Sequence, residues 1–317
     1  MKKIICFSMV LAVVLTAFSA AAKELKVLTI GNSFADSVFA FTPELAKSFP
    51  DCKLILDRAN LGGCSLERHW KSHLKAEKDA NCKPYYVYSD KSIPHYTLRG
   101  KLAERKWDII TIQQVSRGSW DYNTFQPYAD NLIKLIREVA PQAEIVVHQT
   151  WSYRADAPEF KAGHKWGFGQ QEMYNRLDAS YRKLAEKYNL RVIPTGLAVQ
   201  IFREKTPVKF KICPSEDFKN FKYPELPDQS GEIVGNTRWV RDRKTRLRRI
   251  GVDYKHFNAK GQYMQACLWF AFIFDKKCSD IKYVPKSLKD TPAAEIELIK
   301  RSAQQALDSY KQVKPAK

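Results

Sequence analysis

The sequence of 317 residues lacks the short motifs that usually hold a metal ion or a redox-active cysteine pair. It contains no C-x-x-C pair, which argues against a zinc ribbon and against a thioredoxin-like redox site. His69 and His73 lie one helical turn apart, but no glutamate follows His69 to form H-E-x-x-H, and no third ligand is evident. We therefore interpret these two histidines as part of a polar helix face.

Acidic residues are few relative to basic ones. The chain has 34 Asp and Glu against 53 Lys and Arg, a formal net charge of +19, and the densest basic cluster spans residues 241–249. A surplus of this size attracts anionic partners over long distances. We favour an acidic polysaccharide or an anionic membrane surface over nucleic acid, because the N-terminus, with Lys2 and Lys3 before an apolar run at 4–18, predicts export, and an exported protein seldom meets nucleic acid. A solvated basic loop without a ligand is the alternative.

No apolar run is long enough to predict a stable membrane span. Residues 4–18 are almost wholly apolar, follow Lys2 and Lys3, and precede small residues at 19–22 that offer a cleavage site. We therefore predict a signal peptide at residues 1–22 and a periplasmic or secreted protein. A single N-terminal anchor is the alternative.

Removal of that segment leaves six of the seven cysteines. An even number in an oxidising compartment permits disulfides, but the sequence does not choose among the pairings. Cys267 lies in an apolar run of helical length, so we predict a buried thiol there.

Apolar runs of strand length alternate with segments of helix length, the pattern of an α/β domain with a parallel sheet. The predicted strands are 25–30, 53–56, 107–113, 144–148 and 191–194. The predicted helices are 38–48 (kinked or restarted at Pro43), 64–74, 125–139, 171–188, 263–274 and 295–310. Polar, irregular stretches at about 76–100 and 205–250 are interpreted as insertions in a single domain spanning 23–317.

Ser33 follows the first predicted strand directly, in the turn Gly31-Asn32-Ser33. In open parallel sheets ligands bind beyond the carboxyl ends of the strands, so a hydroxyl there is well placed for chemistry. Gly31 permits a tight turn, and the N-terminus of a following helix can direct N–H groups at an oxyanion. The alternative is that Asn32 or Ser33 only caps that helix.

A serine nucleophile needs a base that accepts its proton. His256 lies three residues after Asp253, shortly before the apolar helix 263–274. A carboxylate at this spacing can accept a hydrogen bond from one ring nitrogen and leave the other facing the serine, as in a Ser-His-Asp triad. An exposed Asp and His at a helix start is the alternative.

Acyl transfer also requires donors for an oxyanion. The backbone N–H of Ser33 is one candidate, and Gly62 or Gly63 after the second strand supplies another. The side-chain amide of Gln113, or less favourably Gln114, ends the third strand and is the third candidate. The alternatives are an ordinary glycine turn and surface glutamines.

Together these segments resemble the SGNH hydrolase superfamily, also called GDSL esterases. There a G-D-S or G-N-S serine turn follows strand one, a glycine follows strand two, an asparagine follows strand three, and D-x-x-H lies near the C-terminus. The chain matches the order and departs in one block, where Gln113 and Gln114 replace the usual G-x-N-D. A strand ending in Gln is similar to carbohydrate-active members, and to an exported, largely uncharacterised bacterial subgroup with I-G-N-S-F and L-Q-[EQ] motifs.

The resemblance implies a three-layer α/β/α, flavodoxin-like fold with a five-stranded parallel sheet, and no metal or organic cofactor. It implies that Ser33 attacks an ester while His256 takes the proton and Asp253 holds the ring. Four further residues near the presumed cleft are candidates for lining the substrate pocket: Asn32, Gln114, His148 and Trp151. His148 could equally be a core histidine. Trp151 is a candidate for sugar stacking, but aromatic residues in such numbers are more often packed in the interior.

We therefore expect a serine ester hydrolase that removes small acyl groups, acetyl first among them, from a carbohydrate or glycan. Two other functions remain open at this stage. One is lipid or thioester hydrolysis with the same triad, and the other is a catalytically inactive glycan-binding protein on this scaffold.

Overall fold

The computed structural model describes residues 22–86 and 95–310. The predicted signal peptide at residues 1–22 lies outside the described residues apart from its last residue, and so does the C-terminal stretch 311–317.

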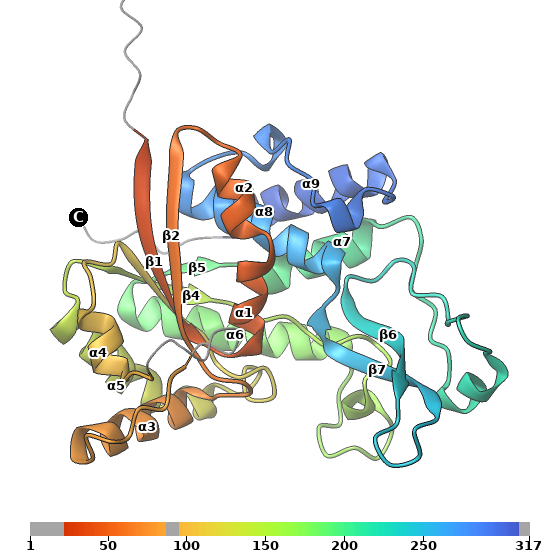
Figure 1. The fold of residues 1–317 in the computed structure, drawn as a ribbon, viewed down its shortest axis with the longest axis horizontal. Coiled ribbons are helices and arrows are strands. Elements are labelled where there is room, and N and C mark those ends of the chain that lie inside the picture. Colours follow the sequence, from red (N-terminus) through yellow and green to blue (C-terminus); the bar gives the residue numbers. More distant parts are fainter. Residues whose placement is uncertain (1–21, 87–94, 311–317) are drawn as a thin grey trace, which may run out of the picture.

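Five parallel strands form the central sheet (Figure 1). They run in the order β2-β1-β3-β4-β5, which is the flavodoxin-like order. The strands are β1 (Lys23–Gly31), β2 (Cys52–Asn60), β3 (Ile109–Ile112), β4 (Glu144–His148) and β5 (Arg191–Ile193). Apolar runs predicted all five, because a parallel strand covered on both faces reads as a nearly continuous apolar segment.

Helices cover both faces of the sheet, so the predicted α/β class and layering are confirmed. On one face α2 (Thr42–Lys47), α7 (Thr195–Lys205), α8 (Ala259–Phe274) and α9 (Ala293–Ser309) pack together. The other face carries α3 (Leu66–Lys78), α4 (Leu98–Ala103), α5 (Tyr128–Val139) and α6 (Gln170–Tyr188). Among these α8 is apolar nearly all round and is buried along its length, as expected of a helix inside a core.

Short helical turns connect these layers. The predicted helix 38–48 is split into η1 (Ser37–Ala40) and α2, and Pro43 occupies the first turn of α2, where a proline is tolerated. α1 (Ser33–Asp36) precedes them. The remaining 3₁₀ turns are η2 (Tyr122–Phe125), η3 (Pro158–Phe160), η4 (Ser215–Asn220), η5 (Cys278–Asp280) and η6 (Lys286–Leu288).

The two stretches interpreted as irregular contain some regular structure. In 205–250 and just beyond it, β6 (Val234–Arg241) and β7 (Arg248–Phe257) form an antiparallel hairpin that projects from the side of the sheet (Figure 1). In 76–100, α3 extends to Lys78, and Tyr85 and Tyr96 pair in an isolated bridge before α4. The hairpin escaped prediction because arginines and apolar residues are mixed on both faces of its outer half, which removes the apolar alternation of a half-buried strand.

The six cysteines of the described part of the chain are all free thiols. Cys267 is fully buried in α8, as predicted. No helix within residues 22–86 and 95–310 is both long enough and apolar enough to cross a membrane.

Candidate active site

The serine turn lies at the carboxyl end of β1, between β2 and β3, where the strand order reverses. Asn32 caps α1, its Oδ1 accepting from the N–H of Phe34 at 3.1 Å. Its Nδ2 donates to the carbonyl of Cys64 at 3.1 Å and so ties the turn to the loop after β2. Asn32 therefore performs the capping, and Ser33, at the first position of α1, has a side chain free for another role.

Gly31 is held from two sides. Its carbonyl accepts from Leu61 N–H at 3.1 Å and from His69 Nε2 at 2.9 Å. A Cβ at this position would lie 2.9 Å from the Cβ of Ala35, closer than packed carbons approach, so glycine is required by space.

The assignment of His69 to a polar helix face was wrong, because the residue is fully buried. Burial lowers the pKa of His69 to about 4, which keeps the ring neutral. Since a carbonyl only accepts, Nε2 carries the proton toward Gly31, and Nδ1 accepts from the hydroxyl of Tyr85 at 2.8 Å.

Ser33, His256 and Asp253 meet in one chain of hydrogen bonds. The Oγ of Ser33 lies 2.8 Å from Nε2 of His256, and Nδ1 of His256 lies 2.7 Å from Oδ2 of Asp253. An ionised carboxylate only accepts, so the Nδ1 proton points at Asp253 and Nε2 of the neutral ring is left to accept from Ser33. The structure thus brings together residues separated by 223 positions in the arrangement of a Ser-His-Asp triad.

Asp253 is held ionised by its neighbours. Partial burial alone would raise the pKa of this carboxyl group, but hydrogen bonds from the His256 ring and from the backbone N–H groups of His256 and Lys255 outweigh it. The pKa therefore lies well below its ordinary value of 3.8.

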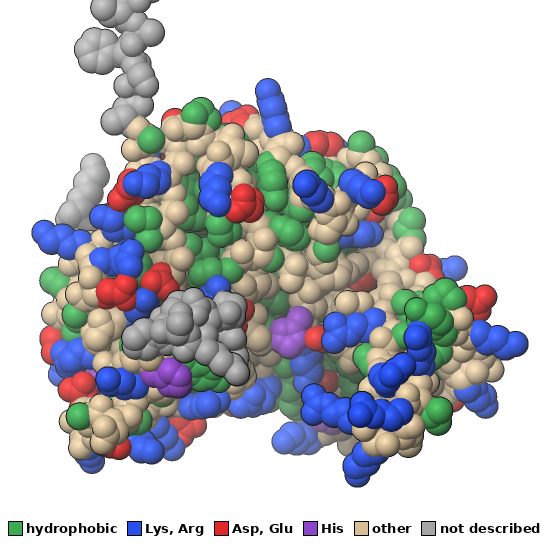
Figure 2. Space-filling model, in the orientation of Figure 1, with side chains coloured by type: hydrophobic (Ala, Val, Ile, Leu, Met, Phe, Trp, Pro, Cys, Tyr) green, Lys and Arg blue, Asp and Glu red, His purple; other side chains and the backbone are tan. Residues whose placement is uncertain are grey.

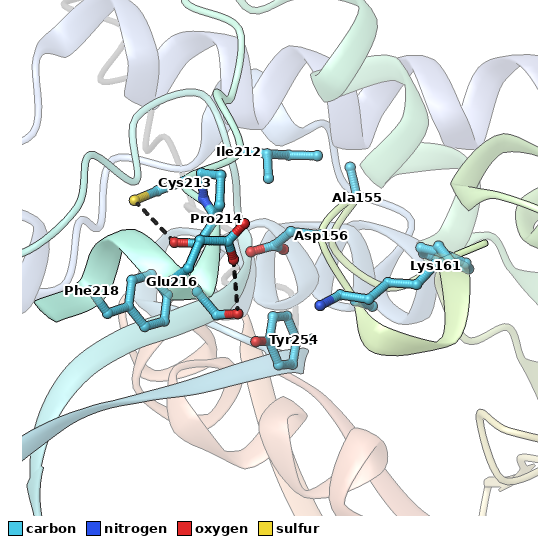
Figure 3. Close-up of a pocket in the computed structure, with 12 residues that line it drawn as sticks. Ala155, Asp156, Lys161, Ile212, Cys213, Pro214, Glu216, Phe218 and Tyr254 are labelled. Atoms are coloured by element: carbon cyan, nitrogen blue, oxygen red, sulfur yellow. Dashed lines mark hydrogen bonds between the residues drawn. The ribbon is translucent and has the colours of Figure 1, made fainter. Parts of the chain in front are cut away.

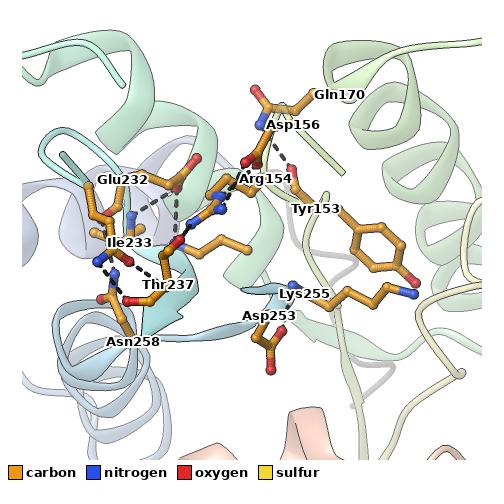
Figure 4. Close-up of polar contacts among 12 residues, drawn as sticks. Tyr153, Arg154, Asp156, Gln170, Glu232, Ile233, Thr237, Asp253, Lys255 and Asn258 are labelled. Carbon is orange, nitrogen blue, oxygen red and sulfur yellow. Dashed lines mark hydrogen bonds and ion pairs between the residues drawn. The ribbon is translucent and has the colours of Figure 1, made fainter. Parts of the chain in front are cut away.

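A buried arginine supports the strand that carries this pair (Figure 4). The guanidinium of Arg154, only 2% exposed, donates to both carboxylate oxygens of Asp156 at 2.6 and 2.8 Å and to Oγ1 of Thr237 on β6 at 3.2 Å. The backbone N–H of Arg154 donates to the carbonyl of Tyr254, directly after Asp253, at 2.9 Å. These bonds fix the hairpin against the loop after β4.

A cavity of about 450 Å³ opens beside the serine and the histidine. It is lined by Ser33, Asp36, Ser37, Phe39, Ala40, Trp151, His256, Phe257 and Gln262. Trp151 lines it as expected, but its ring is sandwiched between Phe34 (centroids 4.2 Å apart) and Phe257 (3.7 Å) and is fully buried. Neither ring face is available for a sugar, so the stacking role considered for Trp151 is wrong and the indole serves as a packed wall.

The side chains of three other candidates, Gln113, Gln114 and His148, point into the protein interior. The amide nitrogen of Gln113 lies 3.0 Å from Nδ1 of His148, and the other ring nitrogen of His148 lies 3.1 Å from Nε2 of Gln265. Burial lowers the pKa of His148 to about 3, so this is a neutral core histidine. Gln114 accepts from Leu66 N–H and donates to the carbonyl of Thr124.

None of these three side chains lines the cavity beside Ser33. The substrate-pocket role of Gln114 and His148 and the donor role of the Gln113 side chain are therefore corrected. All three have polar partners from distant segments, which hold them in the interior.

Gly62 and Gly63 lie in the loop between β2 and α3, which the Asn32–Cys64 and Leu61–Gly31 hydrogen bonds join to the serine turn. Gly63 has φ +60, a conformation that favours glycine. Both glycines remain at least partly exposed. Neither glycine lines the cavity beside Ser33, but their loop is bonded to the serine turn, so their backbone N–H groups remain candidates for the oxyanion.

A second cavity, of about 340 Å³, lies between the loop after Arg154 and the η4 region (Figure 3). Asp156, Lys161, Glu216 and Tyr254 place polar groups around it. It adjoins β7 through Tyr254, next to Asp253. Among the residues that the structure describes, no cluster of three or more His, Cys, Asp or Glu side chains is arranged to hold a metal ion.

Comparison with known proteins places the chain in a family. The sequence model of a domain of unknown function, DUF4886, matches residues 26–222. The chain belongs to the DUF4886 family. The matched segment includes Ser33 and ends before Asp253 and His256. None of the curated proteins matches the chain at a significant level.

The chain was also compared with solved structures. A DUF4886 family protein from Bacteroides uniformis is 24% identical, with a TM-score of 0.66 over 90% of this chain and 96% of that one. A protein from Slackia heliotrinireducens, provisionally described as an SGNH hydrolase, is 16% identical (TM-score 0.43; 77% and 96% covered). A member of the lipolytic G-D-S-L family from Veillonella parvula is 12% identical (TM-score 0.37; 80% and 99% covered). The expected α/β fold with five parallel strands is therefore confirmed, and the Bacteroides uniformis protein shares it.

Proposed function

We propose that the protein is an exported serine ester hydrolase that removes small acyl groups, acetyl first among them, from a carbohydrate. The observation that carries the proposal is the hydrogen-bonded chain from Ser33 Oγ through His256 to Asp253, with distances of 2.8 and 2.7 Å. A serine alone is a weak nucleophile, and a base at hydrogen-bond distance with an oriented tautomer is what activates it.

The reaction proceeds in two similar steps. Ser33 Oγ attacks the ester carbonyl carbon while Nε2 of His256 takes its proton, and Asp253 stabilises the imidazolium that forms. The tetrahedral intermediate collapses when His256 protonates the departing alcohol oxygen, leaving an acyl group on Ser33. Water then attacks this acyl group with His256 again as the base, releasing the acid and restoring Ser33.

The negative oxygen of the intermediate needs donors. We assign them to the backbone N–H of Ser33, which lines the cavity, and of Gly63 or Gly62, whose loop is bonded to the serine turn, whereas the Gln113 side chain turns inward. Removing one such donor typically costs about 10²–10³ in rate.

The lining of the cavity fits an ester of a small acyl group with a sugar, whose other hydroxyl groups need polar partners. Phe39, Ala40 and Phe257 offer apolar surface beside Ser33, and Ser37 and Gln262 offer polar groups in the same wall. His256 and Asp253 are 45% and 40% exposed, so a bulky polymer can approach them from solvent. These features favour an ester displayed on a large carbohydrate.

Hydrolysis of 4-nitrophenyl acetate and octanoate, and acetate release from an acetylated oligosaccharide, test the proposal in wild type and in S33A. The matched control is S48A, because Ser48 is exposed at the C-terminal end of α2 and its hydroxyl donates to the carbonyl of Leu45. We expect S33A to lose turnover and S48A to keep it.

Three results would count against the proposal, the first against all of it and the other two against the substrate or the activity. Full turnover by S33A would end it. A faster reaction with octanoate than with acetate would favour the lipid or thioester hydrolase. Saccharide binding without turnover of any ester would favour the glycan-binding protein.

A further inference from the structure

The β6–β7 hairpin carries a concentration of positive charge. Between Arg238 and Arg249 the sequence has seven Arg or Lys residues and a single acid, Asp242. Lys and Arg side chains gather over this hairpin in the space-filling view (Figure 2). The same hairpin carries Asp253 and His256 near the base of β7. The largest local charge on the sequence is therefore attached directly to the candidate active site.

The strand register shows which cations face the same way as Asp253. Asn236 lies opposite Asp253, Arg238 opposite Gly251, and Val240 opposite Arg249. Residues directly opposite in an antiparallel pair share a face, and so do alternate residues along each strand. Arg238 and Arg249 thus lie on the face of Asp253.

A groove of about 400 Å³ runs along this face. It is lined by Arg238, Val240, Arg249 and Gly251 and continues to Asp253 and Lys255. The other cross-strand pair, Arg241 and Arg248, lies on the opposite face, where the guanidinium of Arg248 sits 3.7 Å from the ring centre of Tyr223.

The two groove arginines are not neutralised by strong ion pairs. Arg238 has no acidic partner among residues 22–86 and 95–310. Arg249 is 63% exposed, and its only acidic neighbour in the described chain is Asp242 at 3.5 Å. Lys255, by contrast, is paired with Glu159 at 2.6 Å. Arg238 and Arg249 are therefore the cations free to receive an external anion.

We infer that this groove is a subsite for the anionic groups of an O-acylated acidic polysaccharide. The inference rests on the proposed function, because a Ser-His-Asp triad attacks carboxylic esters and the polymer must carry such esters beside its charges. At about 3.4 Å per residue, Arg238 (opposite Gly251) lies roughly 7 Å along the strand from Asp253, and Arg249 roughly 14 Å. Anionic groups on successive sugars of one chain then reach both guanidinium groups while an acyl group reaches Ser33.

The experiment compares two double variants of equal charge. R238Q/R249Q removes both groove cations, and R241Q/R248Q removes the same charge from the opposite face of the same hairpin. Acetate release is measured on chemically acetylated polygalacturonate, on chemically acetylated xylan as the neutral polymer, and on 4-nitrophenyl acetate. Binding of unacetylated polygalacturonate is measured separately on the S33A protein, with thermal melting of every variant to verify folding.

We expect R238Q/R249Q to raise the KM for acetylated polygalacturonate about tenfold, because two exposed ion pairs are lost. The KM of this variant should also depend less on salt concentration than that of wild type. Its kcat/KM on 4-nitrophenyl acetate should stay unchanged, and R241Q/R248Q should behave as wild type on all three esters. In the S33A background, R238Q/R249Q should also lose affinity for polygalacturonate.

Three outcomes would overturn the inference, and a fourth would overturn only the proposed function. Equal losses of activity on acetylated polygalacturonate in both double variants would show a general effect of net charge rather than a subsite in the groove. Equal rates of wild type on the acidic and the neutral polymer would remove it while leaving the esterase proposal standing. Preferential binding to vesicles containing phosphatidylglycerol would assign the groove to a membrane surface instead. Loss of all ester turnover with retained, groove-dependent polygalacturonate binding would defeat the proposed function alone.

Discussion

Asp253→Asn tests how far His256 depends on its carboxylate partner. Oδ1 of Asp253 accepts from the N–H groups of Lys255 and His256 at 2.8 and 3.0 Å, and the asparagine oxygen can keep both bonds. The amide nitrogen then replaces Oδ2, which lies 2.7 Å from Nδ1 of His256. Two donors cannot face each other, so the ring adopts the tautomer with its proton on Nε2 and can no longer accept from Ser33.

The size of the effect follows from the exposure of the pair. Replacing this carboxylate in a buried triad costs about 10⁴ in kcat, roughly 5 kcal/mol of barrier. The Asp253 side chain is 40% exposed here, so water can partly solvate the imidazolium. We therefore expect a loss of about 10³ in kcat, with KM nearly unchanged because Asp253 does not hold the substrate.

The assay is steady-state hydrolysis of 4-nitrophenyl acetate with urea unfolding in parallel. Asp242→Asn is the matched control, because Asp242 also accepts two backbone N–H bonds in the same hairpin, from Lys244 and Thr245, and contacts no histidine. It should retain full activity. If D253N keeps more than a tenth of wild-type kcat while remaining folded, the role given to Asp253 is refuted.

Three further predictions concern stability. R154M leaves the Asp156 carboxylate, which is 10% exposed, without its cation and should lower the free energy of unfolding by about 3–5 kcal/mol in a urea titration. A loss below about 1 kcal/mol would contradict the supporting role given to Arg154. G31A would place a Cβ 2.9 Å from the Cβ of Ala35, so it should lower the free energy of unfolding by about 1–3 kcal/mol and also lower kcat. An unaffected kcat would show that the serine turn tolerates the added Cβ. The pKa of His69 falls from 6.5 to about 4 on folding, so between these pH values the unfolded chain binds a proton that the folded chain does not. The free energy of unfolding should therefore fall by roughly 3 kcal/mol when the pH is lowered from about 6.5 to 4. H69Q should reduce this dependence on pH, and an identical dependence in both proteins would refute the linkage.

The sequence predicted the sheet and the serine turn because local signals determine them. Strands buried on both faces are mostly apolar over their buried part, and Gly31-Asn32-Ser33 at the end of the first strand falls where parallel sheets bind ligands. The pair Asp253 and His256 was predicted from its three-residue spacing, yet the strand that carries it was not. β7 begins with two exposed arginines and is only partly buried over most of its length, so its pairing with β6 is not evident from the apolar pattern.

The supporting residues were beyond sequence reasoning because their partners come from distant segments. His69 bonds Gly31, 38 positions away, and Arg154 bonds Thr237, 83 positions away. A lone histidine or arginine gives no local sign of such a partner. Gln113 ends a strand at the expected place, but its direction is set by His148, which only the packed core reveals.

The most direct test of the account is the site of covalent labelling by a fluorophosphonate. This reagent reacts with a serine only when a neighbouring base removes its proton. We expect about one adduct per molecule, located by peptide mass spectrometry on Ser33, absent from S33A and formed much more slowly in H256A. A folded wild-type protein that takes up no label, or an adduct on another serine, would contradict it.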